Sequence, residues 1–320
     1  MARYALRETQ TEGFPTLTLS DGDADLHASF APRLGMIGCS LRQRGAELLG
    51  QRKGLAAYAA SGSTMGIPLL HPWANRLSGF AYVAGGRRVV LDAASPLLHK
   101  DGAGLPMHGL LAACPDWRVT ARGADDTGAQ LTAQLDFAAN PARLAAFPFP
   151  HQLTLAVTLR GAALTMRTTL RPTADVAVPV SFGFHPYLQL PGVPRAEWFV
   201  AAPVRERARL DARLIPTGAR EDVSLQPSRL GDDVFDDLFT GLECPARFVL
   251  AGDGRRVTVE LDDGFPWAQI YAPAADALIC FEPMTAPANA LISGDGLRLV
   301  EPGAEFSASF AIHATSDTYT

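Results

Sequence analysis

The sequence predicts an all-β protein whose antiparallel sheets pack as a sandwich. Apolar and polar residues alternate with a period of two, and turns containing glycine or proline separate the alternating segments. The 24 prolines are spread along all 320 residues, which disfavours long helices. With 48% hydrophobic and 19% charged residues, the chain is globular rather than disordered. No linker of low complexity divides it, so we expect a single domain over residues 1–320.

Five segments alternate most clearly, and each is predicted to be a strand with one buried face. They are residues 131–137, 153–159, 164–170, 257–261 and 306–312. Turn signals occur at residues 160–162, 252–254, 294–296 and 302–303. In mid-chain, residues 141–146 are the one plausible helix, and that helix is short.

Charge and cysteine usage argue against several classes of function. The net charge of −5 gives no basic footprint, so nucleic acid is not an expected partner. The four cysteines are far apart and form no C-x-x-C motif, which favours buried free thiols over a zinc or redox site. They are Cys39, Cys114, Cys244 and Cys280. The sequence shows neither a signal peptide nor an apolar run of about 20 residues, so we expect no membrane partner and a cytoplasmic location.

Glu282 is the most informative carboxylate. The apolar run of residues 277–281 leads into Glu282 and Pro283, which predicts a carboxylate at the end of a buried strand. Burial of an unpaired carboxylate is costly and raises its pKa toward neutrality, which suits a general base. Taken alone, a strand-end glutamate that leaves the sheet and meets water is the commoner alternative.

His185 repeats this pattern. The apolar residues 180–184 lead into His185, then Pro186 fixes the exit of the strand and Tyr187 supplies a hydroxyl. Histidine can donate or accept a proton near pH 7, so one acid-capable and one base-capable group follow two similar strands. On its own, His185 is as compatible with a hydrogen-bonded structural role as with a catalytic one.

His108 is a second candidate for proton transfer. It precedes Gly109, and the missing side chain of a glycine lets another group approach closely. A structural role is equally compatible with His108 alone. Four other histidines have ordinary structural interpretations: His27, His99, His151 and His313.

Residues 68–77 carry a polar cluster after an apolar run that also contains His71. Asn75 and Arg76 place amide and guanidinium donors side by side, which suits the hydroxyl groups of a sugar. Trp73 offers an apolar face for a pyranose ring. A structural arginine paired with a core carboxylate is an equally supported alternative.

Asp236 belongs to an acidic group with aromatic neighbours, residues 232–239, which we expect in a loop. A solvated loop, a Ca²⁺ site built from oxygens, and an aspartate that accepts hydrogen bonds from sugar hydroxyls are all compatible with it. The spacing of an EF-hand is absent, so no dedicated metal site is expected.

Together these segments resemble the aldose 1-epimerase (galactose mutarotase-like) family, from residues 32–36 to residues 301–306, which is nearly the whole chain. Each motif is weak alone, but five in the family's order form a specific combination. The motifs are residues 72–77, 107–109, 185–188, 236–239 and 281–285. The resemblance implies a large antiparallel β-supersandwich with few short helices and an open sugar cleft on one sheet.

The resemblance also implies a role for each matching position. Glu282 corresponds to the general base that takes the proton from the C1 hydroxyl, and His185 to the general acid that protonates the ring oxygen. His108 corresponds to a second histidine at the ring oxygen or its neighbouring hydroxyl. Substrate-binding positions are Asn75, Arg76, Asp236, Trp73 and Tyr187.

The implied activity is that of an isomerase of carbohydrate metabolism that interconverts the α and β anomers of a free aldose. Ring opening requires that one oxygen is deprotonated while another is protonated, and a base and an acid on opposite sides of the anomeric centre do both at once. A small sugar is the expected partner, no cofactor or metal is expected, and the protein is expected to be a monomer or homodimer.

Two alternatives share the same fold. A mutarotase for a hexose 6-phosphate needs additional cations, and the candidates are Arg52, Lys53, Arg87 and Arg88. A carbohydrate-binding protein without catalysis does not need an acid–base pair. Residues 109–115 and 186–190 depart from the pattern of galactose-type members, so the identity of the sugar stays open.

Overall fold

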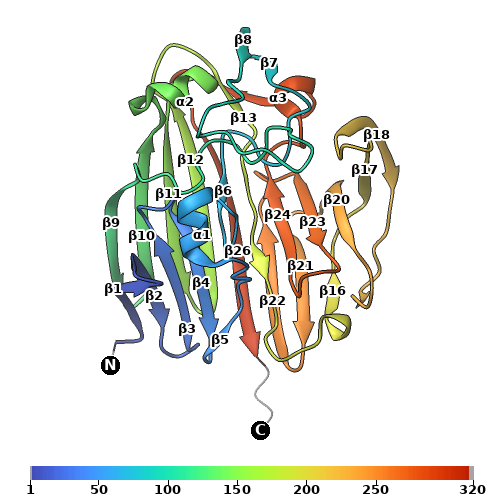
Figure 1. The fold of residues 1–320 in the computed structure, drawn as a ribbon. Coiled ribbons are helices and arrows are strands. Elements are labelled where there is room, and N and C mark those ends of the chain that lie inside the picture. Colours follow the sequence, from blue (N-terminus) through green and yellow to red (C-terminus); the bar gives the residue numbers. More distant parts are fainter. Residues whose placement is uncertain (1, 317–320) are drawn as a thin grey trace.

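A computed structural model describes residues 2–316, in which antiparallel sheets are arranged in two layers (Figure 1). A nine-stranded sheet forms one layer, and a five-stranded and an eight-stranded sheet lie side by side against it. The helices of the described residues are short: α1 (Gly54–Ser61), α2 (Pro141–Ala146) and α3 (Ala290–Ser293). The all-β prediction is confirmed.

The nine-stranded sheet is antiparallel throughout. Its order is β19 (Ser228–Arg229), β16 (Phe199–Ala201), β21 (Ala246–Gly252), β22 (Arg255–Leu261), β26 (Phe306–Ser316), β12 (Ala163–Pro172), β11 (His151–Arg160), β10 (Gly128–Asp136) and β9 (Arg118–Asp125). All five predicted strands lie in this sheet, because each is long enough to alternate clearly between core and surface.

The opposing layer contains the sheet on which the site is built. The eight-stranded sheet has the order β18 (Pro216–Asp222), β17 (Glu206–Leu210), β20 (Phe235–Thr240), β23 (Trp267–Ala272), β24 (Ile279–Met284), β14 (Gly183–Phe184) and β6 (Leu69–Leu70), with β15 (Tyr187–Leu188) also paired to β24. The five-stranded sheet follows the chain: β1 (Tyr4–Thr11), β2 (Phe14–Asp21), β3 (Leu26–Ala31), β4 (Ile37–Gln43) and β5 (Ala46–Glu47). Two two-stranded sheets complete the set: β7 (Ala81–Ala84) with β8 (Arg87–Val90), which form a hairpin, and β13 (Val178–Val180) with β25 (Arg298–Val300), which are far apart in the chain.

The hydrophobic core lies between the two layers. In β11 and β12 every second residue is buried, and the register pairs Leu153 with Leu170 on the inward face. Aromatic rings bridge the layers, with ring centroids of Phe184 and Phe310 4.9 Å apart. Burying one face of each sheet in this way removes apolar surface from water and is the main stabilising contribution to the fold.

Helix prediction was partly successful. The expected helix at residues 141–146 is α2, and the side chain of its N-cap Asn140 accepts hydrogen bonds from the backbone amides of Ala142 and Arg143. Helix α1 was not predicted, since it is short and has no side-chain cap at its start. Residues 131–137 end differently from the prediction, because Asp136 caps a 3₁₀ turn (η1, Phe137–Ala139) that takes Phe137 out of the strand.

The prediction of buried free cysteines is confirmed at three positions and wrong at the fourth. Cys39, Cys114 and Cys280 are buried free thiols as predicted, but Cys244 is exposed, because it lies in the loop between β20 and β21. No helix within residues 2–316 is long and apolar enough to cross a membrane.

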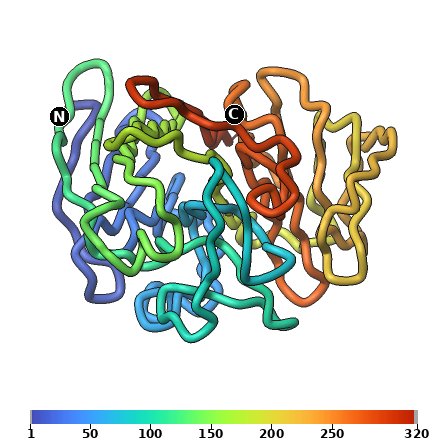
Figure 2. Tube along the Cα trace, turned by 90° about the horizontal axis from the view of Figure 1, so that it is seen from above, coloured from blue at the N-terminus to red at the C-terminus, as the bar shows by residue number. Residues whose placement is uncertain are grey.

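Loops gather on one side of the molecule. Viewed from above, the light-blue segment that holds α1 and the teal chain near residue 100 project away from the sheets (Figure 2). Loop residues that flank these segments line the candidate site: Arg52, Thr64, Asn75, Arg76, Met107 and His108.

Candidate active site

Three neighbouring strands display polar side chains on the outer face of the eight-stranded sheet. The register places Asp236 of β20 opposite Tyr271 of β23, and Gln269 of β23 opposite Glu282 of β24. Successive residues of a strand point to opposite faces, so these side chains share one face. Gln269 Nε2 donates to Asp236 Oδ1 at 2.7 Å, which fixes the Asp236 carboxylate.

Glu282 is buried in this face and has almost no contact with solvent, being 2% exposed. Its Oε2 atom has no hydrogen-bond partner among residues 2–316. Burial raises its pKa well above the usual value, the negative charge of Asp236 adds to that shift, and Arg76 opposes it. The alternative of a solvated strand-end glutamate is therefore wrong.

His185 follows β14 and reaches Glu282. The distance between His185 Nε2 and Glu282 Oε1 is 3.3 Å. Burial lowers the pKa of His185, and the nearby His108 and Arg52 lower it further. A buried acid with a raised pKa and a buried imidazole with a lowered pKa form a pair of the kind that exchanges protons in active sites.

Tyr187 holds the imidazole of His185 in place. The two rings are stacked, with centroids 4.3 Å apart and planes 7° from parallel. The Tyr187 hydroxyl lies 3.3 Å from His185 Nε2 and 2.7 Å from Thr64 Oγ1, and it accepts a hydrogen bond from Arg52 Nη1 at 3.2 Å. Three partners use all of the bonding capacity of a phenol oxygen.

His108 and Asn75 are joined through their backbones. The amide of His108 donates to the carbonyl of Asn75 at 2.9 Å, and both residues have positive φ, at 62° and 56°. Such conformations are uncommon outside glycine and cluster at functional sites. A Cβ atom at Gly109 would lie 2.2 Å from the His71 carbonyl oxygen, so this glycine permits close approach, as predicted.

His108 brings a second imidazole to the pair. Its ring lies edge-on to His185, with centroids 5.5 Å apart. Burial lowers the pKa of His108 to about 3, with smaller effects from Arg76 and His99, so this imidazole is neutral. Its Nδ1 atom has no partner among residues 2–316.

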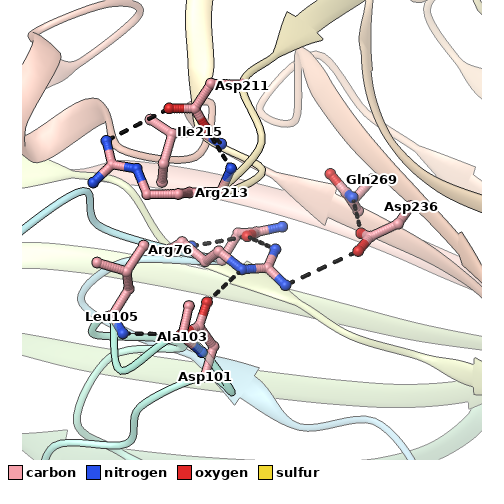
Figure 3. A network of polar contacts seen from close by, with 10 residues as sticks. Arg76, Asp101, Ala103, Leu105, Asp211, Arg213, Ile215, Asp236 and Gln269 are labelled. Atoms are coloured by element: carbon pink, nitrogen blue, oxygen red, sulfur yellow. Dashed lines mark hydrogen bonds and ion pairs between the residues drawn. The ribbon is translucent and has the colours of Figure 1, made fainter.

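The guanidinium of Arg76 is hydrogen-bonded to Asp101 and Asn75 and lies near the carboxylate of Asp236 (Figure 3). Its Nε donates to Asp101 Oδ2 at 2.9 Å, its Nη1 donates to Asn75 Oδ1 at 3.1 Å, and its Nη2 lies 4.0 Å from Asp236 Oδ2. Burial raises the pKa of Asp236, while Arg76 and Gln269 oppose that shift.

A cavity of about 230 Å³ connects these groups. Its lining is Arg52, Thr64, Asn75, Arg76, Met107, His108, His185, Tyr187, Asp236, Tyr271 and Glu282. Most of these side chains end in hydrogen-bonding groups, so the cavity suits a small polyhydroxylated molecule, with a carboxylate and two imidazoles available for proton transfer.

The structure brings together seven of the eight predicted site residues and corrects one. Trp73 is 1% exposed and packs in the main core, so its ring is not available to a ligand. The indole is more stable there, because the core removes its large apolar surface from water.

Two predicted settings also differ. Asp236 lies in strand β20 rather than in a loop, because residues 235–239 pair in antiparallel register with residues 268–272 of β23. Glu282 lies within β24 rather than at its end, since pairing with β23 continues through Pro283 to Met284.

Four residues of the site and its surroundings were not predicted from the sequence. Thr64 and Tyr271 line the cavity, whereas Asp101 and Gln269 are hydrogen-bonded to residues that line it, Arg76 and Asp236. No local feature of the sequence indicates that Asp101 contacts Arg76. Of the four candidate phosphate-binding cations, Arg52 lines the cavity, whereas Lys53, Arg87 and Arg88 do not.

No group of three or more histidine, cysteine, aspartate or glutamate side chains is placed to hold a metal ion within the part of the chain that the structure describes. The acidic segment around Asp236 instead has one carboxylate in the cavity, bonded to Gln269.

Comparison with known proteins is consistent with this architecture. The fold matches a galactose mutarotase-like protein from Clostridium acetobutylicum with a TM-score of 0.85 and 15% identity, over 98% of each chain. A galactose 1-epimerase from Lactobacillus acidophilus matches with a TM-score of 0.76 and 14% identity, over 99% of each chain. An uncharacterized Escherichia coli protein, YihR, is 24% identical over 262 residues, which cover 77% of this chain and 80% of that protein.

The fold and the cleft thus define a galactose mutarotase-like β-supersandwich. A sequence profile of the family described as aldose 1-epimerase matches residues 32–313. The chain belongs to the aldose 1-epimerase family.

Proposed function

We propose that the protein is a mutarotase that interconverts the α and β anomers of a free aldose by acid–base ring opening. The observation that carries the proposal is the buried pair of Glu282 and His185, 3.3 Å apart, beside a polar cavity of about 230 Å³. Binding alone does not require a carboxylate and an imidazole with oppositely shifted pKa values.

In the proposed mechanism Glu282 takes the proton of the C1 hydroxyl while His185 gives a proton to the ring oxygen. The bond between C1 and the ring oxygen breaks, C1 becomes an aldehyde, and rotation about C1–C2 exposes its other face. Closure returns both protons in the reverse sense, so no atom or electron is gained or lost.

Burial of the pair favours the outcome of the proton transfers, and it makes the carboxylate–imidazolium form that begins the step the less populated one-proton state. Before the step, the proposed pair is a carboxylate and an imidazolium; after it, the pair is a carboxylic acid and a neutral imidazole. A buried site disfavours charge, so it stabilises the second state, which accompanies the open-chain sugar.

The other cavity residues are proposed to hold the sugar. Asn75, Arg76 and Asp236 supply donors and acceptors for its hydroxyls, and His108 lies on the same side of the cavity as His185. Because His108 is buried and neutral, its role is to accept or donate a hydrogen bond at the ring oxygen or the adjacent hydroxyl.

The test follows the optical rotation of freshly dissolved α-D-glucose, α-D-galactose and other aldoses. We expect wild type to accelerate mutarotation of at least one sugar, and Glu282→Gln to slow it by about 10²- to 10⁴-fold while sugar binding is retained. The exposed Glu305→Gln serves as the control. Equal rates for Glu282→Gln and wild type would refute the assigned base.

One observation favours a second candidate substrate, an aldose with an anionic substituent such as a hexose 6-phosphate. The guanidinium of Arg52 lines the cavity, is held by Tyr187, and forms no ion pair with a carboxylate of residues 2–316. A guanidinium without a carboxylate partner suits bidentate contact with a phosphate group.

This alternative is tested by comparing kcat/KM for α-D-glucose and α-D-glucose 6-phosphate in wild type, Arg52→Gln and Arg88→Gln. If the substrate is anionic, Arg52→Gln loses activity selectively on the phosphate, whereas Arg88→Gln, on the exposed hairpin β7–β8, does not. Equal effects of Arg52→Gln on both sugars favour the free aldose.

A further inference from the structure

We infer that Asp101 is a positioning residue, which holds the guanidinium of Arg76 in the orientation that leaves its outer nitrogen for the substrate. The inference rests on the proposed function and assigns a role to a residue that touches no part of the cavity. It deepens the account of sugar binding by Arg76 and Asp236.

Each nitrogen of Arg76 faces a different group. Nε donates a hydrogen bond to Asp101 Oδ2 at 2.9 Å, and Nη1 donates one to Asn75 Oδ1 at 3.1 Å. Nη2 lies 4.0 Å from Asp236 Oδ2, which is beyond hydrogen-bond distance. The side chains of Arg76 and Asp101 are 12% and 9% exposed, so the contact is largely shielded from water. Charge-assisted bonds of this kind are among the stronger ones in proteins.

The Asp101 carboxylate is itself fixed by its own loop (Figure 3). Its Oδ1 accepts hydrogen bonds from the amides of Ala103 and Leu105, both at 2.9 Å, and the amide of Asp101 donates to the Leu105 carbonyl at 2.9 Å. These bonds lower the pKa of Asp101, together with Arg76, although burial acts in the opposite direction. Oδ2 is therefore a preset, ionised acceptor for Arg76.

The same loop continues into the site. Residue Arg76 forms a β-bridge with Met107, and the amide of Leu77 donates to the Pro106 carbonyl at 2.9 Å. One loop thus carries Asp101, which orients Arg76, and His108, which lines the cavity.

Loss of the Asp101 charge changes what Arg76 can do. Without it, the guanidinium is free to turn toward Asp236, and a direct pair between them would occupy both groups that are proposed to bind sugar hydroxyls. In Asp101→Asn the side-chain oxygen can keep the bonds to Ala103 and Leu105, but the amide nitrogen then faces another donor, Nε of Arg76. This variant keeps the loop and removes the contact.

The chain contains a matched control at Asp211. Its Oδ1 accepts from the amides of Arg213 and Ile215 at 2.8 and 3.0 Å, and its own amide donates to the Ile215 carbonyl at 2.9 Å, so the loop has the geometry of the Asp101 loop. Asp211 pairs only with the exposed Arg213 within the described residues. Asp211→Asn therefore measures the cost of the same substitution in the same kind of loop, without effect on Arg76.

The experiment measures kcat and KM by polarimetry with α-D-glucose and α-D-galactose, and records the Nε–H signal of Arg76 by ¹H–¹⁵N NMR. We expect Asp101→Asn to raise KM about tenfold and to change kcat less than about threefold. The Arg76 Nε–H signal, protected in wild type, is expected to exchange with water and disappear. Asp211→Asn should leave KM and this signal unchanged.

Each outcome has one meaning. Equal KM values for Asp101→Asn and Asp211→Asn, or a fall in kcat at constant KM, would overturn the inference. If wild type accelerates no aldose, the proposed function fails, and the NMR signal decides the role of Asp101 by itself. If Asp101→Asn does not fold, the wild-type spectrum still tests the contact, because an unprotected Arg76 Nε–H contradicts it.

Discussion

Nε2 of His185 lies 3.3 Å from Oε1 of Glu282, and both side chains are buried. Burial raises the pKa of Glu282 and lowers that of His185, so both shifts favour the uncharged form of each group. The pair therefore holds one proton over a range of pH. A second proton creates a buried cation, and loss of the first leaves a buried anion, and each is unfavourable in a dry site.

The pair should give a bell-shaped dependence of kcat/KM on pH. The one-proton form is the active one, because the proposed base must be able to accept a proton while the acid can give one. On the acid side we expect kcat/KM to fall with an apparent pKa below 6.5, the ordinary value for histidine. On the alkaline side we expect it to fall with an apparent pKa well above 4.5, the ordinary value for glutamate. The two limbs belong to the coupled pair rather than to either residue alone.

Polarimetric rates from pH 4 to pH 10 test this profile. Glu282→Gln should remove the bell-shaped pH dependence together with most of the rate, whereas Glu305→Gln should reproduce the wild-type profile. A single ionisation at an ordinary carboxyl pKa would contradict the coupled pair.

Glu282 should also cost the protein stability at high pH. Its pKa is raised in the folded state, so its favourable contribution is complete below the unfolded pKa near 4.5 and is lost as pH rises through the folded pKa. Each pKa unit of the shift corresponds to about 1.4 kcal/mol. Glu282→Gln removes this titration, so thermal unfolding should show a stability gain over wild type that grows with pH.

The absence of any pH-dependent difference between Glu282→Gln and wild type would mean that the carboxylate is not desolvated. Glu305→Gln, at an exposed position, should follow wild type at every pH.

Tyr187→Phe distinguishes two roles for the hydroxyl. That hydroxyl already contacts His185, Thr64 and Arg52, so its removal should disturb the acid rather than the sugar. We expect kcat to fall about tenfold, the loss of roughly one hydrogen bond, with KM within about twofold of wild type. A rise in KM at constant kcat would instead make Tyr187 a direct substrate contact.

A suitable control for this substitution is Tyr82→Phe. Tyr82 is also buried and donates to the Ala146 carbonyl at 2.7 Å, but it does not line the cavity. Steady-state kinetics should therefore show the fall in kcat for Tyr187→Phe and not for Tyr82→Phe.

A second histidine pair, away from the cavity, predicts acid sensitivity. Nε2 of His71 lies 2.8 Å from Nε2 of His151, and His151 Nδ1 donates to the Phe149 carbonyl at 2.6 Å. His151 therefore accepts the proton of His71 Nε2, and both rings are neutral. Burial lowers the pKa of His71, and burial lowers that of His151 to about 4.

Because both pKa values are depressed on folding, their contribution to stability is present above pH 6.5 and is lost as pH falls. We expect the free energy of unfolding to drop between pH 6.5 and pH 4 by about 1.4 kcal/mol per pKa unit for each histidine. Denaturant unfolding of the double variant His71→Leu/His151→Leu should show a weaker pH dependence. The exposed His27→Asn should show the wild-type slope.

The sequence predicted the strands and most of the cavity for different reasons. Period-two alternation identifies β11 and β12 because a two-faced strand must separate its apolar side chains from its polar ones. Glu282 and His185 stood out because a single titratable residue followed an apolar run. The apolar run before Glu282 could not show that this residue lies inside β24. The strand continues past Glu282 because its residues pair with β23, which is a separate segment of the chain.

The positions of Trp73 and Asp101 could not be predicted from the sequence. A tryptophan beside Asn75 and Arg76 suits both a sugar face and a core, and packing between the sheets put it in the core. Asp101 stands 25 positions from Arg76, and no local pattern joins them.

From the sequence alone came the alternating strands and the types of group available for chemistry, because both depend on residues close together in the chain. Only the tertiary structure decided that Glu282 and His185 are buried 3.3 Å apart and that Arg76 is hydrogen-bonded to Asp101. Those contacts arise from strand register and loop closure between distant segments, and they set the desolvation and the charges that determine each pKa.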